Sequence, residues 1–107
     1  MKLPVSENAV KLPLTAFAKT SIQIVRPEGW LYEIAIRKTA PDKYEALLLQ
    51  CTHQRNQLLP IPKGFLCSLH GSKFNLNGDV VKGPAERPLK KFETTMDQGE
   101  LVIFLKS

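Results

Sequence analysis

The chain has 107 residues, with a hydrophobic fraction of 43%, a charged fraction of 23% and a formal net charge of +5. This length supports one domain with a modest core, and the composition is that of an ordinary soluble globular protein. No run approaches the roughly 18 apolar residues of a membrane-spanning helix, and no apolar signal core follows the N-terminus, so we expect a cytoplasmic protein without a membrane segment. An exported or lipid-anchored protein whose N-terminal leader has been removed would also show no signal core, so this alternative stays open.

The 15 basic residues are spread along the chain, with a local concentration at residues 82–91. A basic surface of this kind can steer acidic partners at low salt, although it can also be merely solvated. Basic and aromatic residues are not interleaved as they are in nucleic-acid binders, so we expect no nucleic-acid partner.

Alternating apolar residues predict four β-strands in the first half of the chain, near residues 10–17, 20–26, 30–38 and 43–50. A period of two is typical of strands that bury one face. Trp30 opens the third of these runs and is expected to belong to the core. Pro27 and Gly29 separate the second run from the third, as turn residues do.

After Cys51 the sequence changes character, and residues 51–73 contain many Pro, Gly and polar residues with only short apolar pieces. Asn77-Gly78 between apolar residues then predicts a hairpin, and two last strands follow near 90–96 and 100–105. Eight to ten short strands without a helical period indicate an all-β protein, an antiparallel sandwich or barrel, with residues 1–107 forming a single domain.

The only two cysteines and the only two histidines form two short pairs, C-T-H at 51–53 and C-S-L-H at 67–70. Two thiolates and two imidazoles are a common tetrahedral zinc set, but zinc fingers usually present a Cys pair and then a His pair. A disulfide closing a loop of about 15 residues is a second alternative. Because each loop offers one Cys and one His, both loops could send sulfur to one iron and nitrogen to another, which favours a two-iron cluster.

These two pairs, with Gly71 and Ser72 after the second and Gly83-Pro84-Ala85 further on, resemble the signature of the Rieske iron-sulfur family. The resemblance covers about forty residues in order, from Cys51 to Leu89. It implies an antiparallel Rieske-like β-sandwich with a small cluster-binding subdomain at about 50–75 and a proline loop at about 83–88. It also implies a [2Fe-2S] cluster whose ligands are Cys51, His53, Cys67 and His70.

The resemblance extends to residues that tune the cluster. Ser72 matches a serine that donates its hydroxyl to a bridging sulfide, which favours the reduced state. Phe74 stands where high-potential members have a tyrosine, so the hydrogen bond of that tyrosine is missing and we expect an intermediate to low-intermediate potential. Subunits of cytochrome bc complexes carry an extra disulfide at the positions of Asn56 and Leu69, and the 13 residues between His53 and Cys67 are fewer than usual.

The resemblance therefore implies a small Rieske-type ferredoxin, a one-electron carrier rather than an enzyme, serving as a component of an oxidoreductase or oxygenase system. Its partners would be redox proteins, a reductase and an oxygenase or other acceptor, and we expect Arg55 and Leu69 to contact them. Two alternatives are a soluble Rieske domain of a membrane-associated oxidoreductase complex and a zinc-binding module.

Overall fold

The structure of the protein, a computed structural model, describes residues 1–105. In that range the chain forms short β-strands and one turn of 3-10 helix, so the predicted all-β class is confirmed. The strands are β1 (Lys2–Leu3), β2 (Ala9–Pro13), β3 (Ile22–Pro27), β4 (Ile34–Ala40), β5 (Lys43–Leu48), β6 (Leu59–Ile61), β7 (Gly64–Leu66), β8 (Lys73–Asn75), β9 (Val80–Lys82), β10 (Lys91–Phe92), β11 (Thr94–Asp97) and β12 (Glu100–Phe104).

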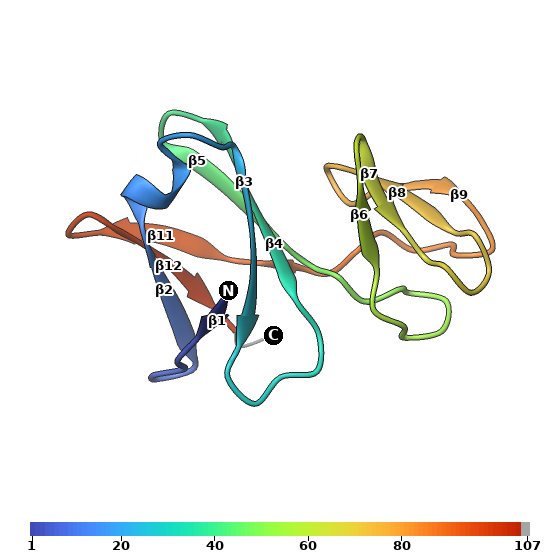
Figure 1. Ribbon diagram of the computed structural model, residues 1–107, viewed down its shortest axis with the longest axis horizontal. Coiled ribbons are helices and arrows are strands. Elements are labelled where there is room, and N and C mark those ends of the chain that lie inside the picture. The colour runs from blue at the N-terminus through green and yellow to red at the C-terminus, as the bar shows by residue number, and fades with distance from the viewer. Residues whose placement is uncertain (106–107) are drawn as a thin grey trace.

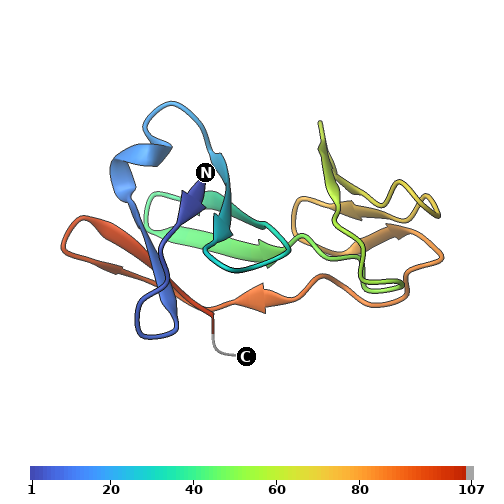
Figure 2. The ribbon, with the colours of Figure 1, turned by 60° about the horizontal axis from the view of Figure 1, so that its bottom comes forward.

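Three sheets make up two lobes (Figure 1). The base lobe (residues 1–48 and 91–105) contains a five-stranded sheet in the order β1-β3-β4-β5-β10 and a three-stranded sheet in the order β11-β12-β2. The tip lobe (residues 49–90) contains the four-stranded sheet β6-β7-β8-β9. All strand pairs are antiparallel except the two-residue pair of β1 with β3. The first strand, β1, and the last strand, β12, both lie on the base lobe (Figure 2).

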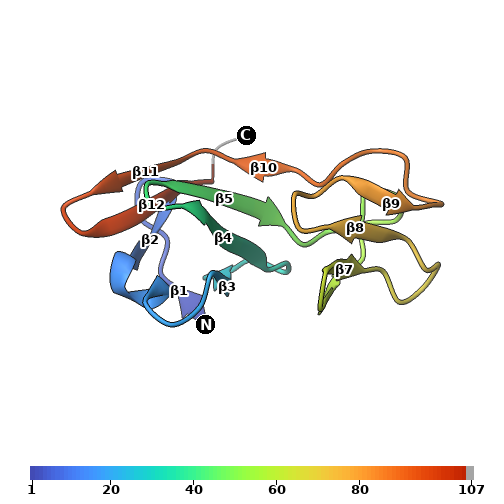
Figure 3. The same ribbon diagram turned by 90° about the horizontal axis from the view of Figure 1, so that it is seen from above.

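The two lobes are joined by two adjacent strands. β5 leads into the tip lobe and β10 returns from it, and these strands pair with each other (Figure 3). The molecule is consequently elongated, with principal extents of 41 × 28 × 20 Å. No helix in the described range has the length and hydrophobicity needed to cross a bilayer.

Both faces of the central strands are buried. Ile34 and Ile36 of β4 point into the base core, while Ala35 between them packs into a second core that extends into the tip lobe. The alternating pattern in β4 and β5 predicted one solvent-facing side, but the tip lobe covers part of that side. The second core consists of Ala35, Leu47, Leu49, Cys51, Leu58, Phe65, Cys67, Phe74, Ala85 and Leu89.

The four early strands are all somewhat shorter than predicted, and the first and third differ most. The first ends at Pro13, and residues Leu14–Phe17 form a 3-10 turn instead. The third begins at Ile34, because Trp30 and Tyr32 lie in the loop that precedes it. Trp30 nevertheless packs against the base core, as expected, with its ring 5.9 Å from that of Phe92.

The last half of the chain contains the hairpin β6–β7 within the Pro-rich stretch, where the apolar pattern gave no strands. The hairpin predicted at Asn77-Gly78 is present as β8–β9, and its turn is held by the Asn75 side chain, whose oxygen accepts the N–H groups of Asn77 and Asp79. The strand predicted at 90–96 divides at Glu93, since β10 pairs with β5 and β11 pairs with β12.

Candidate cluster-binding site

Two six-residue loops with the same backbone hydrogen bonds carry the Cys-His pairs. In the first loop (51–56), the amide of Cys51 donates to the carbonyl of Asn56 and the amide of Arg55 donates to the carbonyl of Cys51, both at 2.8 Å. In the second loop (67–72), Cys67 bonds in the same way to the carbonyl of Ser72 and the amide of Gly71, at 2.8 and 2.9 Å. Each loop is therefore a closed turn that begins at its cysteine.

The fifth residue of each loop has a left-handed backbone conformation, with φ of 52° at Arg55 and 78° at Gly71. This conformation turns the chain sharply enough for the fifth amide to reach the carbonyl of the first residue. Glycine adopts it freely, whereas a residue with a side chain does so at a cost of about 1 kcal/mol. The first loop thus holds Arg55 in a conformation that glycine would adopt more easily.

The two cysteines lie side by side in the second core. Cys51 is 1% exposed and Cys67 is 0% exposed, and neither is disulfide-bonded, so the disulfide alternative is wrong. Burial raises the pKa of the Cys67 thiol, but hydrogen bonds from the backbone amides of His70 and Leu69 and from the Cys51 side chain lower it. The net pKa lies below the usual thiol value. These surroundings favour the thiolate, the form that binds metal.

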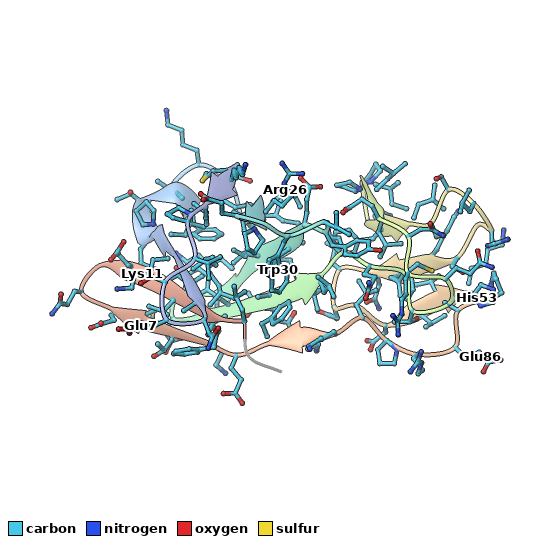
Figure 4. All side chains as sticks on the ribbon, turned by 90° about the horizontal axis from the view of Figure 1, so that it is seen from below. Glu7, Lys11, Arg26, Trp30, His53 and Glu86 are labelled. Atoms are coloured by element: carbon cyan, nitrogen blue, oxygen red, sulfur yellow. The ribbon has the colours of Figure 1, made fainter. Side chains whose placement is uncertain are left out.

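The two histidines lie on the outside of the same loops. Both are exposed, and their rings face each other edge to face with centroids 5.5 Å apart. His53 occupies the end of the tip lobe farthest from Glu7 and Lys11 (Figure 4). The loops therefore present an inner pair of sulfurs and an outer pair of imidazoles.

The proline loop (83–88) contacts both Cys-His loops. Ser72, which is fully buried, accepts the amide N–H of Ala85 through its hydroxyl oxygen at 3.0 Å. On the first loop, the Thr52 hydroxyl donates to the carbonyl of Arg87 at 2.7 Å, and the Arg87 guanidinium donates to the carbonyl of Thr52 at 3.2 Å. The proline loop consequently ties together two segments that are far apart in sequence.

Tyr32 and Thr52 are supporting residues that the sequence did not reveal. The Tyr32 hydroxyl donates a hydrogen bond to the carbonyl of Arg55 and so connects the loop before β4 to the first loop. In the sequence, Tyr32 alternates with Trp30 and Ile34 and so has the pattern of a strand residue. The neighbouring residues gave no indication that Tyr32 contacts a distant loop. Thr52 could have been suspected only from its place between Cys51 and His53.

The predicted partner-contact residues lie at the surface. Arg55 is exposed and Leu69 is 63% exposed, which is unusual for a large apolar side chain. Asn56, at the position of one extra cysteine of the bc-type subunits, supplies a backbone carbonyl that closes the first loop.

The donor set suits a cluster with two irons. Within residues 1–105, no three His, Cys, Asp or Glu side chains gather around a common point as the ligands of a single ion do. The buried sulfurs could bind one iron in the dry interior, and the exposed imidazoles could bind a second iron at the surface. Phe74, a core residue with 1% exposure, brings no hydroxyl to this region.

Known iron-sulfur subunits of the cytochrome b6-f complex resemble this chain in sequence. A cytochrome b6-f complex iron-sulfur subunit 2 from Trichormus variabilis is 45% identical over 42 residues, which are 39% of this chain and 22% of that protein. A cytochrome b6-f complex iron-sulfur subunit 3 from Nostoc sp. is 36% identical over 55 residues, 51% of this chain and 29% of that protein. The matches thus span less than a third of these relatives.

Solved structures share the fold. The plasma membrane Rieske protein PetC3 from Synechocystis PCC 6803 has a TM-score of 0.59 at 22% identity, covering 91% of this chain and 86% of that chain. A chain from the complex of reduced oxygenase and oxidized ferredoxin in carbazole 1,9a-dioxygenase has a TM-score of 0.65 at 22% identity, covering 94% of this chain and 96% of that chain.

The Rieske [2Fe-2S] domain model matches residues 16–93, well over half of the chain, and includes both Cys-His loops and the proline loop. The protein therefore belongs to the Rieske [2Fe-2S] domain family, which implies that it carries a [2Fe-2S] cluster.

Proposed function

We propose that the protein is a small Rieske-type ferredoxin in which Cys51 and Cys67 bind the inner iron and His53 and His70 bind the outer iron. The observation that carries this assignment is the arrangement of two buried, adjacent thiols behind two exposed imidazoles. The bound cluster supplies a one-electron couple, which in Rieske centres lies between roughly −150 and +300 mV.

Each proposed ligand pair has a different task. The buried cysteines hold their sulfurs away from water, where the amides of Leu69 and His70 stabilise negative charge on Cys67. The neutral imidazoles take the place of two anionic thiolates, so that the site is less negative and accepts an electron more readily than an all-Cys site. Their exposure lets a partner approach the outer iron through His53 and His70.

We further propose that the chain is a carrier and not itself an enzyme. A non-haem oxygenase needs a second iron site with two histidines and a carboxylate, and both histidines of this sequence are assigned to the cluster. Its partners would be a reductase that supplies electrons and an oxygenase or other acceptor that takes them. Arg55 and Leu69, next to the proposed ligands, would contact these partners.

A second candidate function is that of the soluble domain in a membrane-associated oxidoreductase complex. It is favoured by the likeness to cytochrome b6-f iron-sulfur subunits, which is limited to 39–51% of this chain. The cytoplasmic location predicted from the sequence competes with this candidate. Fractionation of cells, followed by detection of the protein, separates them: a carrier remains in the soluble fraction and a complex subunit sediments with membranes.

The absorption and EPR spectra of the purified protein test the cluster assignment. We expect a brown protein whose reduced form has a rhombic EPR signal with an average g value below that of the free electron. C67S and H53A should lose this signal, whereas S68A, an exposed position in the second loop, should keep it. A colourless protein that contains zinc would show that the assignment is wrong.

A further inference from the structure

The positive charge of the molecule is concentrated in the tip lobe. Residues 49–90 contain six basic and two acidic residues, a net charge of +4, whereas the remaining 65 residues contain nine basic and eight acidic residues. Nearly all of the net charge therefore lies on the lobe that carries the Cys-His loops. A charge distribution of this kind orients the tip toward negatively charged surfaces during diffusional encounter.

A cleft of about 360 Å³ opens between the first loop and the proline loop. Its walls combine three cationic side chains, Arg55, Arg87 and Lys90, with the polar groups of Gln50 and Thr52, and no acidic residue lines it. Cys51 lies at its inner wall. The cleft therefore adjoins one of the proposed cluster ligands.

The three cations remain available for a ligand. Among residues 1–105 both ion pairs use Glu45, which binds Arg37 and Lys91 in the base lobe, so none of the cleft cations is neutralised in this way. Arg87 is oriented by its hydrogen bond to the Thr52 carbonyl. Arg55 and Lys90 are exposed, and the Lys90 ammonium lies 5.5 Å from the centre of the Phe92 ring.

An acidic residue, Glu86, lies in a hollow that shares Thr52 and Arg87 with the cleft. Glu86 lines a neighbouring hollow together with His53, Pro84, Arg87 and Thr52, and in Figure 4 it lies close to His53 at the end of the tip lobe. The hollow thus has mixed charge, while the cleft beside it is purely cationic. An anionic group is consequently drawn to the cleft side of the first loop.

We propose that this cationic cleft receives the carboxylates of an acidic segment on the protein redox partner, which places that partner beside His53. The inference rests on the proposed electron-carrier function and names the chemistry of the partner surface. Arginine is suited to this task because its planar guanidinium can bind a carboxylate with two parallel hydrogen bonds. Docking on the first-loop side also leaves both exposed imidazoles near the contact.

The test uses the cluster-loaded protein and two inorganic oxidants of opposite charge. Reduced protein is mixed in a stopped-flow instrument with hexacyanoferrate(III), an anion, or with tris(1,10-phenanthroline)cobalt(III), a cation. The R55Q/K90Q double variant is compared with K11Q/K19Q, which removes the same charge at exposed positions of the base lobe. An oligo-glutamate peptide and a single-stranded oligonucleotide serve as competitors.

We expect R55Q/K90Q to slow oxidation by the anion about tenfold at an ionic strength of about 10 mM, and K11Q/K19Q to slow it less than about twofold. Oligo-glutamate should inhibit the wild type and not R55Q/K90Q. Oxidation by the cation should become faster in R55Q/K90Q.

Three results would overturn the proposal: equal slowing in the two double variants, failure of oligo-glutamate to inhibit, and stronger inhibition by the oligonucleotide. The last result would make the cleft a nucleic-acid site. A normal Rieske EPR signal in every variant shows that such a failure concerns docking alone. Absence of that signal in the wild type would instead remove the proposed function itself.

Discussion

Replacing Ser72 with alanine removes a fully buried hydroxyl from the boundary between the second loop and the proline loop. Its oxygen accepts the N–H of Ala85 at 3.0 Å, and Ala85 is only 4% exposed. In S72A this amide loses its partner in a place that water does not reach. An unpaired buried donor costs about 1–3 kcal/mol, so we expect the free energy of unfolding to fall by about 2 kcal/mol.

The same substitution should change the reduction potential. The Ser72 oxygen accepts from Ala85, so its own proton is not used in that bond, and the proposed role of Ser72 is to donate this proton to the cluster. Reduction adds negative charge, so such a hydrogen bond stabilises the reduced state more than the oxidised state. If the difference is about 1–2 kcal/mol, the potential of S72A falls by about 40–90 mV, since 59 mV corresponds to a factor of ten for one electron.

Two measurements separate these effects. A redox titration followed by EPR gives the potential, and denaturant unfolding of the same samples gives the stability. S68A is the matched control, because Ser68 is an exposed serine of the same loop and should change neither quantity. An S72A protein that is less stable but has the wild-type potential would show that the hydroxyl only braces the proline loop. Unchanged stability would refute the role of the Ala85 hydrogen bond.

Three further predictions concern single contacts in the tip lobe, beside the first loop and in the base lobe. A Cβ at Gly64 would lie 1.9 Å from the backbone oxygen of Phe74, so G64A should lower the free energy of unfolding by about 3 kcal/mol or more. G29A is the control: a Cβ there meets open space, and only the φ of +85° makes the substitution cost about 1 kcal/mol. Equal losses of stability in the two variants would contradict this prediction. Y32F should cost about 1 kcal/mol and speed hydrogen exchange of the Arg55 amide, and unchanged exchange would argue against the Tyr32 contact. R37Q breaks a half-buried hydrogen bond to Glu45 and an exposed one to Asn77, so it should lower the free energy of unfolding by about 1–2 kcal/mol. K91Q should cost less than about 0.5 kcal/mol, because Lys91 is 52% exposed and well screened; similar losses in thermal unfolding would be inconsistent with the geometry.

Patterns among neighbouring residues predicted the strands and turns that depend on interactions between neighbouring residues. The alternation in β4 and β5 reflects packing on one face of a strand, and Asn77-Gly78 supplies the left-handed turn that a hairpin needs. The Pro-rich stretch was misleading, since β6 and β7 have only three residues each. Pro60 is tolerated in β6 because an edge strand leaves N–H positions unpaired.

Contacts between distant segments could not be predicted from spacing. The strand expected at 90–96 changes sheets at Glu93, which depends on where β5 and β12 lie and not on the residues themselves. In the same way, Tyr32 reaches the first loop over 23 residues of sequence. The four Cys and His residues could be proposed as cluster ligands because their types and spacing are unusual, whereas the residues that support them are of ordinary types.

The structure explains how the loops can be held without the disulfide that bc-type subunits use. Each loop is closed by two backbone hydrogen bonds, and its cysteine is packed in the second core. The proline loop then joins the two loops through Ser72–Ala85 on one side and Thr52–Arg87 on the other. A disulfide would connect the loops directly, whereas here a third segment forms hydrogen bonds with each of them. Movement of the proline loop should therefore affect both halves of the site together, and S72A should loosen the first loop as well as the second. Faster hydrogen exchange at the amides of both Arg55 and Gly71 in S72A would support this coupling, and a change confined to Gly71 would argue against it.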